Sequence, residues 1–327
     1  MKPKILLLLL IMQLSKICTA QIKEFYKTTS NAAILLYKKE GDRLIAHGTA
    51  FLLCNYDNGS DETILITCEH VTHHDTLIAA IPATDSLRKE FIRQKQTTIT
   101  FATNNGFQTV GFDGNNLLFS IPVKQGINCY RHSTLDLVAI FCDLPNTLLN
   151  TQNNTIPLTN LKTLPKSYIS DKNEMYPGQE ITFVGFPSGI GTQNGFYGTS
   201  LGRDQKTNPL FRKGIISWTS DNADIFLVDG FSYGGNSGSP VFSIPNSESS
   251  GKLIGMVFGH LNDEVEVNKI VMDSVDDKIE SFTSLHINNG LAKCIPAYLI
   301  YDFAMRAVKS RSVLLSQKMK DYNLFVK

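Results

Sequence analysis

The chain has 327 residues, of which 42% are hydrophobic and 9% aromatic, and its 31 basic residues nearly balance its 30 acidic ones. This composition excludes collagen-like, coiled-coil and disordered proteins, and it provides enough apolar side chains for one large or two modest hydrophobic cores. A formal net charge of +1 gives no electrostatic reason to expect nucleic acid or anionic lipid as a partner.

The first twenty residues have the pattern of a signal peptide. Lys2 and Lys4 form a basic start, Ile5–Met12 is an unbroken apolar run, and Cys18–Ala20 supplies the small residues that signal peptidases accept. The apolar run is too short to span a bilayer, which needs about 20 residues. We therefore expect residues 1–20 to direct export to the periplasm or outside the cell, with no membrane anchor.

The sequence after this segment predicts mainly short strands. Apolar or alternating runs are separated by Gly, Asn and Asp, which is typical of an all-β barrel or sandwich. In chain order, the expected strands are Ala32–Lys38, Arg43–Ala46, Gly48–Leu53, Glu62–Thr67, Thr97–Ala102, Leu117–Val123, Leu137–Phe141, Ile181–Val184, Ile215–Trp218, Ile225–Val228, Pro240–Phe242 and Leu253–Phe258.

Helical signals are fewer than strand signals. Asp85–Gln94 begins with a cap and carries apolar residues at helical spacing, and Pro296–Met319 has a broad apolar stripe. Leu144–Pro177 is rich in Asn, Thr and Pro and is interpreted as a link between two halves, whereas Asn262–Asp277 is acidic and is interpreted as a solvated excursion. The expected domains are an N-terminal half over 21–150, a linker over 151–177, a C-terminal half over 178–295, and a helix and tail over 296–327.

Five cysteines follow the expected cleavage site. An odd count leaves at least one thiol free or bridged to another chain, and export permits disulfides without requiring them. The sequence leaves open the pairing of Cys54, Cys68, Cys129, Cys142 and Cys294.

Three separate segments carry a histidine, an aspartate and a serine in contexts that suit nucleophilic catalysis. His70 follows an apolar strand in LITCEHV, Asp136 opens the apolar strand LDLVAIF, and Ser237 lies in GGNSGSPV. A serine hydroxyl becomes a nucleophile when an imidazole takes its proton, and a carboxylate holds that imidazole. The histidine and the aspartate are weak signals alone, whereas the serine segment is uncommon. The order His, Asp, Ser strengthens the joint interpretation.

The glycines beside Ser237 suit the other need of acyl transfer, which is a site for an oxyanion. Two backbone N–H groups must point at the negative oxygen of the tetrahedral intermediate. Glycine permits backbone angles that other residues resist. We expect the turn at Asn236 to place the amides of Gly235 and Ser237 on one side.

These segments resemble the trypsin-like serine peptidases of the chymotrypsin fold, nearest to their bacterial HtrA and glutamyl-endopeptidase branches. LITCEHV is similar to the family's histidine segment, LDLVAIF to its aspartate strand and GGNSGSPV to its serine segment "GNSGGPL". Other similar segments are GTAFL at 48–52, GQEITFVGFPSG at 178–189, LIGM at 253–256 and NGLAKCIP at 289–296. The resemblance covers residues 32–300.

The resemblance implies an all-β fold of two six-stranded antiparallel β-barrels with a C-terminal α-helix and the site in the cleft between the barrels. It implies a serine endopeptidase in which His70 is the general base, Asp136 orients it and Ser237 forms an acyl-enzyme. Gly235 and Ser237 would supply the oxyanion hole. The expected partner is a polypeptide substrate, and no cofactor and no metal are expected. The oligomeric state is left open.

The resemblance also suggests two substrate-binding residues. Phe231, six residues before Ser237, would lie at the base of the primary pocket, and an apolar residue there disfavours Lys or Arg in the substrate. His260 would lie near a strand that lines the pocket. It would contact an acidic substrate side chain, as in glutamate-specific relatives, or it is a loop histidine near Asp263 and Glu264.

Two other functions compete with the peptidase. A binding protein on the same scaffold would keep the three residues with a blocked cleft, because fold does not guarantee activity. A metal-dependent hydrolase is suggested by Glu69 and His70 with His73 and His74 nearby. That spacing matches no familiar helical zinc motif, and a surface histidine cluster also explains His73 and His74.

Overall fold

The computed structural model describes most of the chain after the expected signal peptide. The described residues are 20–41, 43–54, 63–94, 98–103, 106–112, 116–142, 147–149, 155–157, 161–187, 209–220, 224–245, 251–271 and 278–325. Apart from Ala20, the predicted signal peptide lies outside these residues. Residues 20–30 are helical and precede the first strand.

A ten-stranded sheet forms the N-terminal half. Its order is β5-β6-β7-β4-β1-β2-β3-β9-β8, with antiparallel neighbours throughout, and β12 pairs in parallel with β2. The strands are β1 (Ala33–Glu40), β2 (Arg43–Cys54), β3 (Thr63–Thr67), β4 (Thr76–Pro82), β5 (Thr98–Thr103), β6 (Gly106–Phe112), β7 (Asn116–Pro122), β8 (Cys129–Arg131), β9 (Val138–Phe141) and β12 (Thr163–Leu164).

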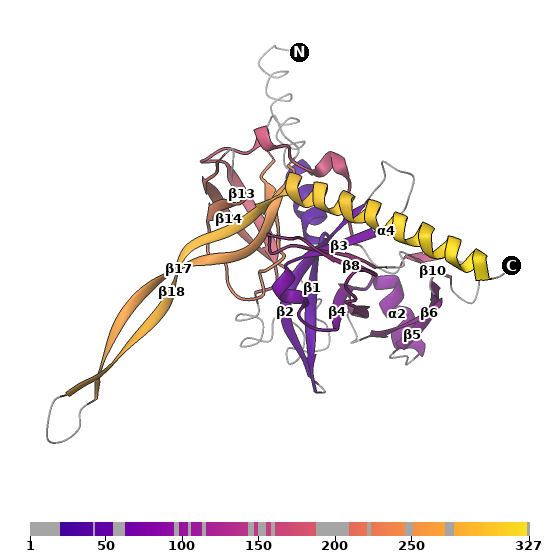
Figure 1. Cartoon of the computed structure of the whole chain (residues 1–327), viewed down its shortest axis with the longest axis horizontal. Helices are drawn as coiled ribbons and strands as arrows, with labels where there is room; N and C mark the ends of the chain where they lie inside the picture. The colour runs from indigo at the N-terminus through magenta and orange to yellow at the C-terminus, as the bar shows by residue number, and fades with distance from the viewer. Residues whose placement is uncertain are drawn as a thin grey trace, which may run out of the picture.

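A closed six-stranded barrel forms the C-terminal half. Its order is β13-β14-β15-β18-β17-β16, and all neighbours are antiparallel. The strands are β13 (Glu180–Gly185), β14 (Leu210–Trp218), β15 (Phe226–Asp229), β16 (Pro240–Ser243), β17 (Leu253–Val271) and β18 (Lys278–Pro296). Helix α4 (Ala297–Phe325) follows directly and lies across the N-terminal half (Figure 1).

The predicted fold class is confirmed as mostly β, but over the described residues only the second half closes into a barrel, and the first half is a ten-stranded sheet in place of the expected barrel. The chain is mostly β, it ends in the predicted helix, and its second half is the predicted six-stranded barrel. In the first half, β4-β1-β2-β3-β9-β8 form a run of six strands, and β7, β6 and β5 extend it beyond β4. Helix α2 (Asp85–Gln94) precedes this extension and has the predicted bounds.

Short elements occupy much of the region between the halves. β10 (Thr147–Leu149) and β11 (Thr155–Pro157) pair with each other in a separate two-stranded sheet. The 3₁₀ turns η3 (Lys166–Tyr168) and η4 (Lys172–Glu174) follow β12. The domain boundaries drawn at 151 and 177 stay a prediction.

Two hydrophobic clusters hold the molecule together, and strand β13 serves both. Ile181 and Phe183 belong to the barrel cluster, whereas Val184, together with Phe186 just after the strand, belongs to the larger cluster of the N-terminal sheet. That larger cluster also includes buried residues of α4, namely Ile300, Tyr301, Phe303, Ala304, Ala307 and Val308. One wall of the barrel and the C-terminal helix therefore pack against the N-terminal half.

Strands β17 and β18 continue far beyond the barrel as a two-stranded ribbon (Figure 1). The sequence predicted only Leu253–Phe258 as a strand here, but the pairing runs on to Val271, opposite Lys278. The acidic stretch interpreted as a solvated excursion is thus part of a paired ribbon as far as Val271, although Asn262 and Glu264 are exposed as expected.

Two further questions from the sequence concern membranes and disulfides. Within the described ranges, no helix combines the length and the apolar character needed to cross a bilayer.

The five cysteines in the described part of the chain form no disulfide, and four of them are buried.

Candidate active site

His70 is positioned by the end of strand β3. The strand stops at Thr67, Cys68 is extended with φ −78° and ψ 150°, and the chain then turns into the short 3₁₀ helix η2 (Glu69–Thr72). This turn lifts the imidazole out of the buried strand, and 44% of the side chain is exposed. The partly exposed imidazole thus projects from the end of a buried strand.

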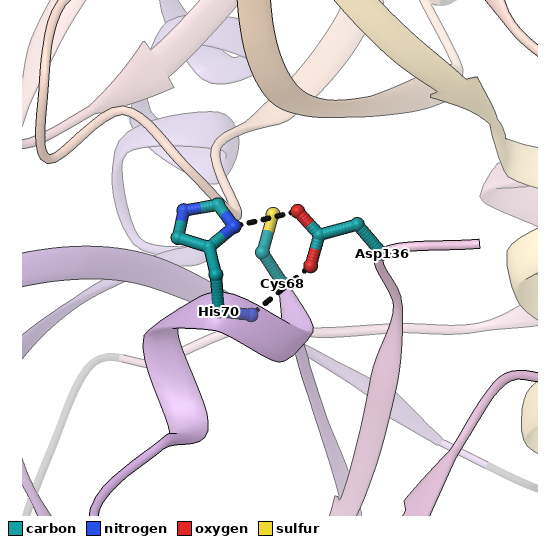
Figure 2. A group of neighbouring side chains, drawn as sticks. All are labelled: Cys68, His70 and Asp136. Atoms are coloured by element: carbon teal, nitrogen blue, oxygen red, sulfur yellow. Dashed lines mark hydrogen bonds and ion pairs between the residues drawn. The ribbon is translucent and has the colours of Figure 1, made fainter. Parts of the chain in front are cut away.

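Asp136 approaches His70 from the turn before strand β9. Its Oδ1 accepts a hydrogen bond from the backbone N–H of His70 at 3.0 Å, and its Oδ2 lies 2.5 Å from the imidazole Nδ1 (Figure 2). Burial opposes ionisation of Asp136, but the hydrogen bonds from the side chain and backbone of His70 outweigh it and lower the carboxyl pKa. The carboxylate therefore fixes the ring and the nitrogen that carries its proton.

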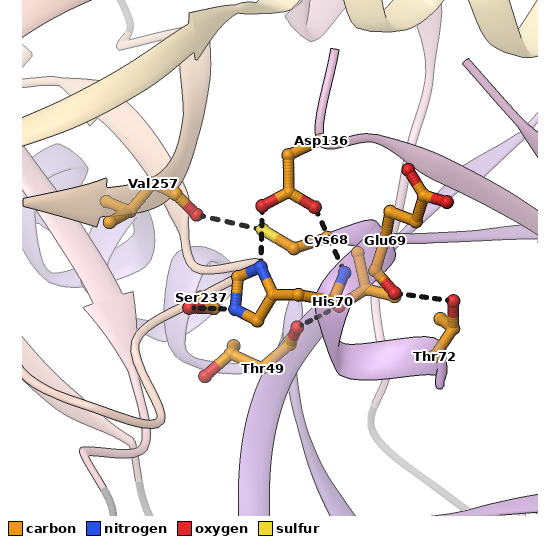
Figure 3. Close-up of polar contacts among 9 residues, drawn as sticks. Thr49, Cys68, Glu69, His70, Thr72, Asp136, Ser237 and Val257 are labelled. Atoms are coloured by element: carbon orange, nitrogen blue, oxygen red, sulfur yellow. Dashed lines mark hydrogen bonds and ion pairs between the residues drawn. The ribbon is translucent and has the colours of Figure 1, made fainter. Parts of the chain in front are cut away.

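Ser237 reaches the other imidazole nitrogen from the C-terminal half. Its Oγ lies 2.8 Å from Nε2 of His70 (Figure 3). The serine sits in the turn before strand β16, between Gly235 and Gly238, each of which has a φ of 89°. Because L residues with side chains rarely adopt this left-handed region, the two glycines allow the turn that presents the hydroxyl.

The three groups form one continuous hydrogen-bonded series across the two halves of the molecule. The carboxylate bonds one imidazole nitrogen, and the other nitrogen bonds the hydroxyl. Such a series can remove the serine proton during attack and stabilise the resulting imidazolium. The structure brings together all three residues that the sequence nominated.

Thr49 of strand β2 is a part of the site that sequence reasoning missed. Its hydroxyl donates to the carbonyl of Gly235 at 2.8 Å and accepts from the amide of Phe186 at 3.1 Å. Its backbone N–H donates to the carbonyl of Ser237 at 2.8 Å. Its own carbonyl accepts the hydroxyl of Thr67 at 2.7 Å. This fully buried residue thus joins the serine turn to the strand that supports His70.

The same contacts hold the turn in which the oxyanion site is expected. Thr49 engages the carbonyls of Gly235 and Ser237, and within the described segments the amides of these two residues have no hydrogen-bond acceptor. The fit is tight, since a Cβ added at Gly238 would lie 1.8 Å from the carbonyl oxygen of Thr49. The turn is therefore held in a conformation that leaves two N–H donors available near the serine.

Cys68 lies beneath the triad and raises the question of a metal. Its sulfur, a ring nitrogen of His70 and a carboxylate oxygen of Asp136 lie within 4.8 Å of one another. Two ligands on one zinc ion, each bound at about 2.0–2.2 Å with tetrahedral angles, are over 3 Å apart. The 2.5 Å separation of His70 Nδ1 and Asp136 Oδ2 is too short for two ligands of one zinc ion.

Burial, aided by the nearby Asp136, raises the pKa of the Cys68 thiol. The thiol donates a hydrogen bond to the Val257 carbonyl at 3.5 Å.

The residues of the metal-hydrolase hypothesis do not converge. Glu69 faces Arg131, with 3.5 Å between carboxylate oxygen and Nε, and His74 makes a T-shaped contact with His47. His73 is exposed. Of all the residues described, only Cys68, His70 and Asp136 gather three potential metal-binding atoms. The geometry favours the hydrogen-bonded triad over a metal centre.

The two predicted substrate-binding residues lie on separate elements. Phe231 is 53% exposed, and its ring stacks on Tyr233 with 6.3 Å between centroids. His260 lies opposite Ala292 in the β17–β18 pair, and its side chain has no hydrogen bond, ion pair or ring contact with any described residue. A shared pocket for Phe231 and His260 stays a prediction.

Comparison with known families agrees with this geometry. The model of the family described as the trypsin-like peptidase domain matches residues 48–256, well over half of the chain. The chain belongs to this family. The match of the trypsin-like peptidase domain includes Thr49, His70, Asp136 and Ser237, and it ends within strand β17. A search of curated proteins finds no match. The nearer likeness to the HtrA and glutamyl-endopeptidase branches stays a prediction.

Proposed function

We propose that the protein is a serine endopeptidase. The observation that carries the proposal is the continuous hydrogen bonding from Asp136 through His70 to Ser237, with 2.5 Å and 2.8 Å between the bonded atoms. The 2.8 Å between Ser237 Oγ and His70 Nε2 is already within the reach of about 2.6–3.2 Å that proton transfer between nucleophile and base requires. A trypsin-like peptidase domain implies a polypeptide as the substrate.

The reaction follows from the positions of the groups. As Ser237 attacks the carbonyl carbon of a peptide bond, Nε2 of His70 takes the hydroxyl proton and then returns it to the leaving amine. The amides of Gly235 and Ser237 donate to the developing oxyanion. Water, activated by the same histidine, releases the acyl group from Ser237.

Asp136 serves as the electrostatic partner of His70. Because its pKa is lowered, the carboxylate remains charged when the imidazole gains its proton. A fixed negative charge beside Nδ1 stabilises the imidazolium and holds the ring so that Nε2 faces the serine. The aspartate therefore acts through the histidine and does not touch the substrate.

The direct test is hydrolysis of a peptide library by the native protein and by Ser237→Ala. We expect Ser237→Ala to lose activity by about 10⁴-fold or more, because the nucleophile is absent. Ser239→Ala is the matched control. Its hydroxyl lies two residues away and has no hydrogen-bond partner in the described structure. Retained hydrolysis in Ser237→Ala would refute the assignment, and a folded native protein that cleaves nothing would favour a binding protein.

We also propose that the protein is exported. The support is the basic start at Lys2 and Lys4 followed by the apolar run Ile5–Met12. N-terminal sequencing of the protein recovered outside the cytoplasm should begin near Gln21. Recovery of an uncleaved chain in the cytoplasm alone would contradict this.

A further inference from the structure

Arg212 of strand β14 is a cation in an unusual place. Along β14, burial alternates, with Phe211, Lys213 and Ile215 exposed and the residues between them partly or fully buried. Arg212 lies opposite Phe183, a residue of the barrel cluster, and shares its side of the strand pair with buried Ile216. The arginine therefore belongs to the inward-facing set at one end of the barrel.

The contacts of Arg212 tie it to the segment that leads into the nucleophile. Its Nη1 donates to the carbonyl of Phe231 at 3.1 Å, and its guanidinium lies 4.6 Å from the ring centroid of Tyr233. Tyr233 in turn accepts, at its carbonyl, the amide of Asn236 at 3.0 Å. Asn236 immediately precedes Ser237. The guanidinium is thus placed by the same short segment that forms the serine turn.

The charge of Arg212 has no counterpart among the residues that the structure describes. Neighbouring Lys213 bonds Glu180 at 3.0 Å, but Arg212 has no ion pair there. Its Nε is buried without a hydrogen-bond partner, and Nη1 has only a neutral carbonyl. An unpaired buried donor is costly, and guanidinium binds carboxylate strongly with two parallel hydrogen bonds. The guanidinium therefore has no anionic partner among the described residues.

The surroundings of Arg212 suit an acidic side chain with an apolar stem. Phe231 and Tyr233 stack at an interplanar angle of 18° and are 53% and 42% exposed. Phe231 and Tyr233 lie six and four residues before Ser237, so the side chain of a substrate residue attacked at Ser237 can pack against these exposed rings. The exposed rings of Phe231 and Tyr233 can cover its methylene groups, and the guanidinium of Arg212 lies against the second ring.

The geometry points to Arg212 as the residue that selects an acidic side chain, Glu or Asp, in the substrate residue whose carbonyl is attacked. This inference rests on the proposed peptidase function and adds its substrate class. It assigns to Arg212 the contact that the sequence suggested for His260. A site whose guanidinium pairs with a substrate carboxylate disfavours substrates without a carboxylate, because the guanidinium donors are then left unpaired.

The test uses peptides that differ only at the residue before the cleaved bond, which is Glu, Gln, Leu or Lys. We expect the native protein to prefer Glu over Gln by at least about tenfold in kcat/KM. Arg212→Gln should lower kcat/KM for the Glu peptide about 10–100-fold and leave the Gln and Leu peptides within about threefold. Arg212→Lys should retain part of the preference, and the matched control Lys213→Gln, on the outer face, should retain all of it.

The outcomes separate this inference from the proposed function. Cleavage by the native protein without a preference for Glu, or an equal loss on all peptides in Arg212→Gln, overturns the role of Arg212 and leaves the peptidase assignment intact. If the native protein cleaves nothing, the peptidase assignment fails. Binding of fluorescent Glu and Gln peptides to Ser237→Ala then tests the site without turnover. Tighter binding of the Glu peptide that disappears with Arg212→Gln supports the acidic site, and equal binding overturns it.

Discussion

At the scale of single residues, Thr49 decides how the serine turn is held. A serine and a histidine that are 167 positions apart in sequence meet at 2.8 Å. Such contact requires the two halves to be fixed to one another to within a fraction of an ångström. Thr49 provides four buried hydrogen bonds at this seam, three of which reach residues of the C-terminal half. We infer that Thr49 is a positioning residue.

Replacing Thr49 by Val removes the hydroxyl and leaves the carbonyl of Gly235 and the amide of Phe186 without this partner. Each buried polar group left unpaired costs about 1–3 kcal/mol. We expect Thr49→Val to lower kcat about 10–100-fold with KM nearly unchanged, because the oxyanion donors lose their alignment. Thr49→Ser, which restores the hydroxyl, should recover most of kcat. A lower melting temperature with native kcat in Thr49→Val would assign the residue to stability alone.

The sequence identified only those site residues that lie in a short, recognisable motif. His70, Asp136 and Ser237 carry the reactive groups in short, typical motifs, so each could be named, and the structure places them together. Thr49 and Arg212 could not be named, because their contacts are with residues far along the chain. No pattern in the sequence near Thr49 indicates that its hydroxyl donates a hydrogen bond to the carbonyl of Gly235, 186 positions later.

At the scale of elements, several strands with apolar patterns were predicted, but the apolar strand β4 (Thr76–Pro82) was missed. Helix α2 has the expected bounds, and β3 and β9 lie within one residue of theirs. Strand β18 was missed because its sequence KIESFTSLHINNGLAKCIP mixes Ser, Thr and Asn with apolar residues and lacks a period of two. Strand β14 was predicted five residues too short at its start because Arg212 and Lys213 interrupt the apolar run.

The ribbon of β17 and β18 beyond the barrel offers a test at this scale. A two-stranded hairpin is at best marginally stable alone, and this one extends away from the body (Figure 1). We expect that replacing residues 265–285 by a two-residue turn, which joins Glu264 to His286 at their paired positions, leaves peptide hydrolysis within about twofold. The melting temperature should shift by only a few degrees.

One outcome of this excision would contradict the expectation that the ribbon is not needed for hydrolysis. If the shortened protein stays folded, as judged by circular dichroism, but no longer hydrolyses peptides, the ribbon contributes to the active site. The triad would then be insufficient without it. A variant that replaces only residues 269–279, nearer the tip, is the matched control for disturbance of the turn itself.

At the scale of the whole molecule, the active site exists only where the two halves meet. The N-terminal sheet supplies His70 and Asp136, and the turn before β16 in the barrel half supplies Ser237. The packing of β13 and α4 against the N-terminal half fixes the position of the two halves relative to one another. The sequence could predict the family and the order of the halves, but the fit between them follows from side-chain packing that no local pattern records.

The most direct test of Ser237 as the nucleophile is its reaction with a serine-directed fluorophosphonate, with the site identified by peptide mass spectrometry and the labelling rate measured. We expect a phosphonyl adduct on Ser237 of the native protein and a fall in labelling rate of about 10³-fold or more in His70→Ala, because the hydroxyl then lacks its base. An adduct on another residue, or an equal labelling rate in His70→Ala, would contradict this expectation.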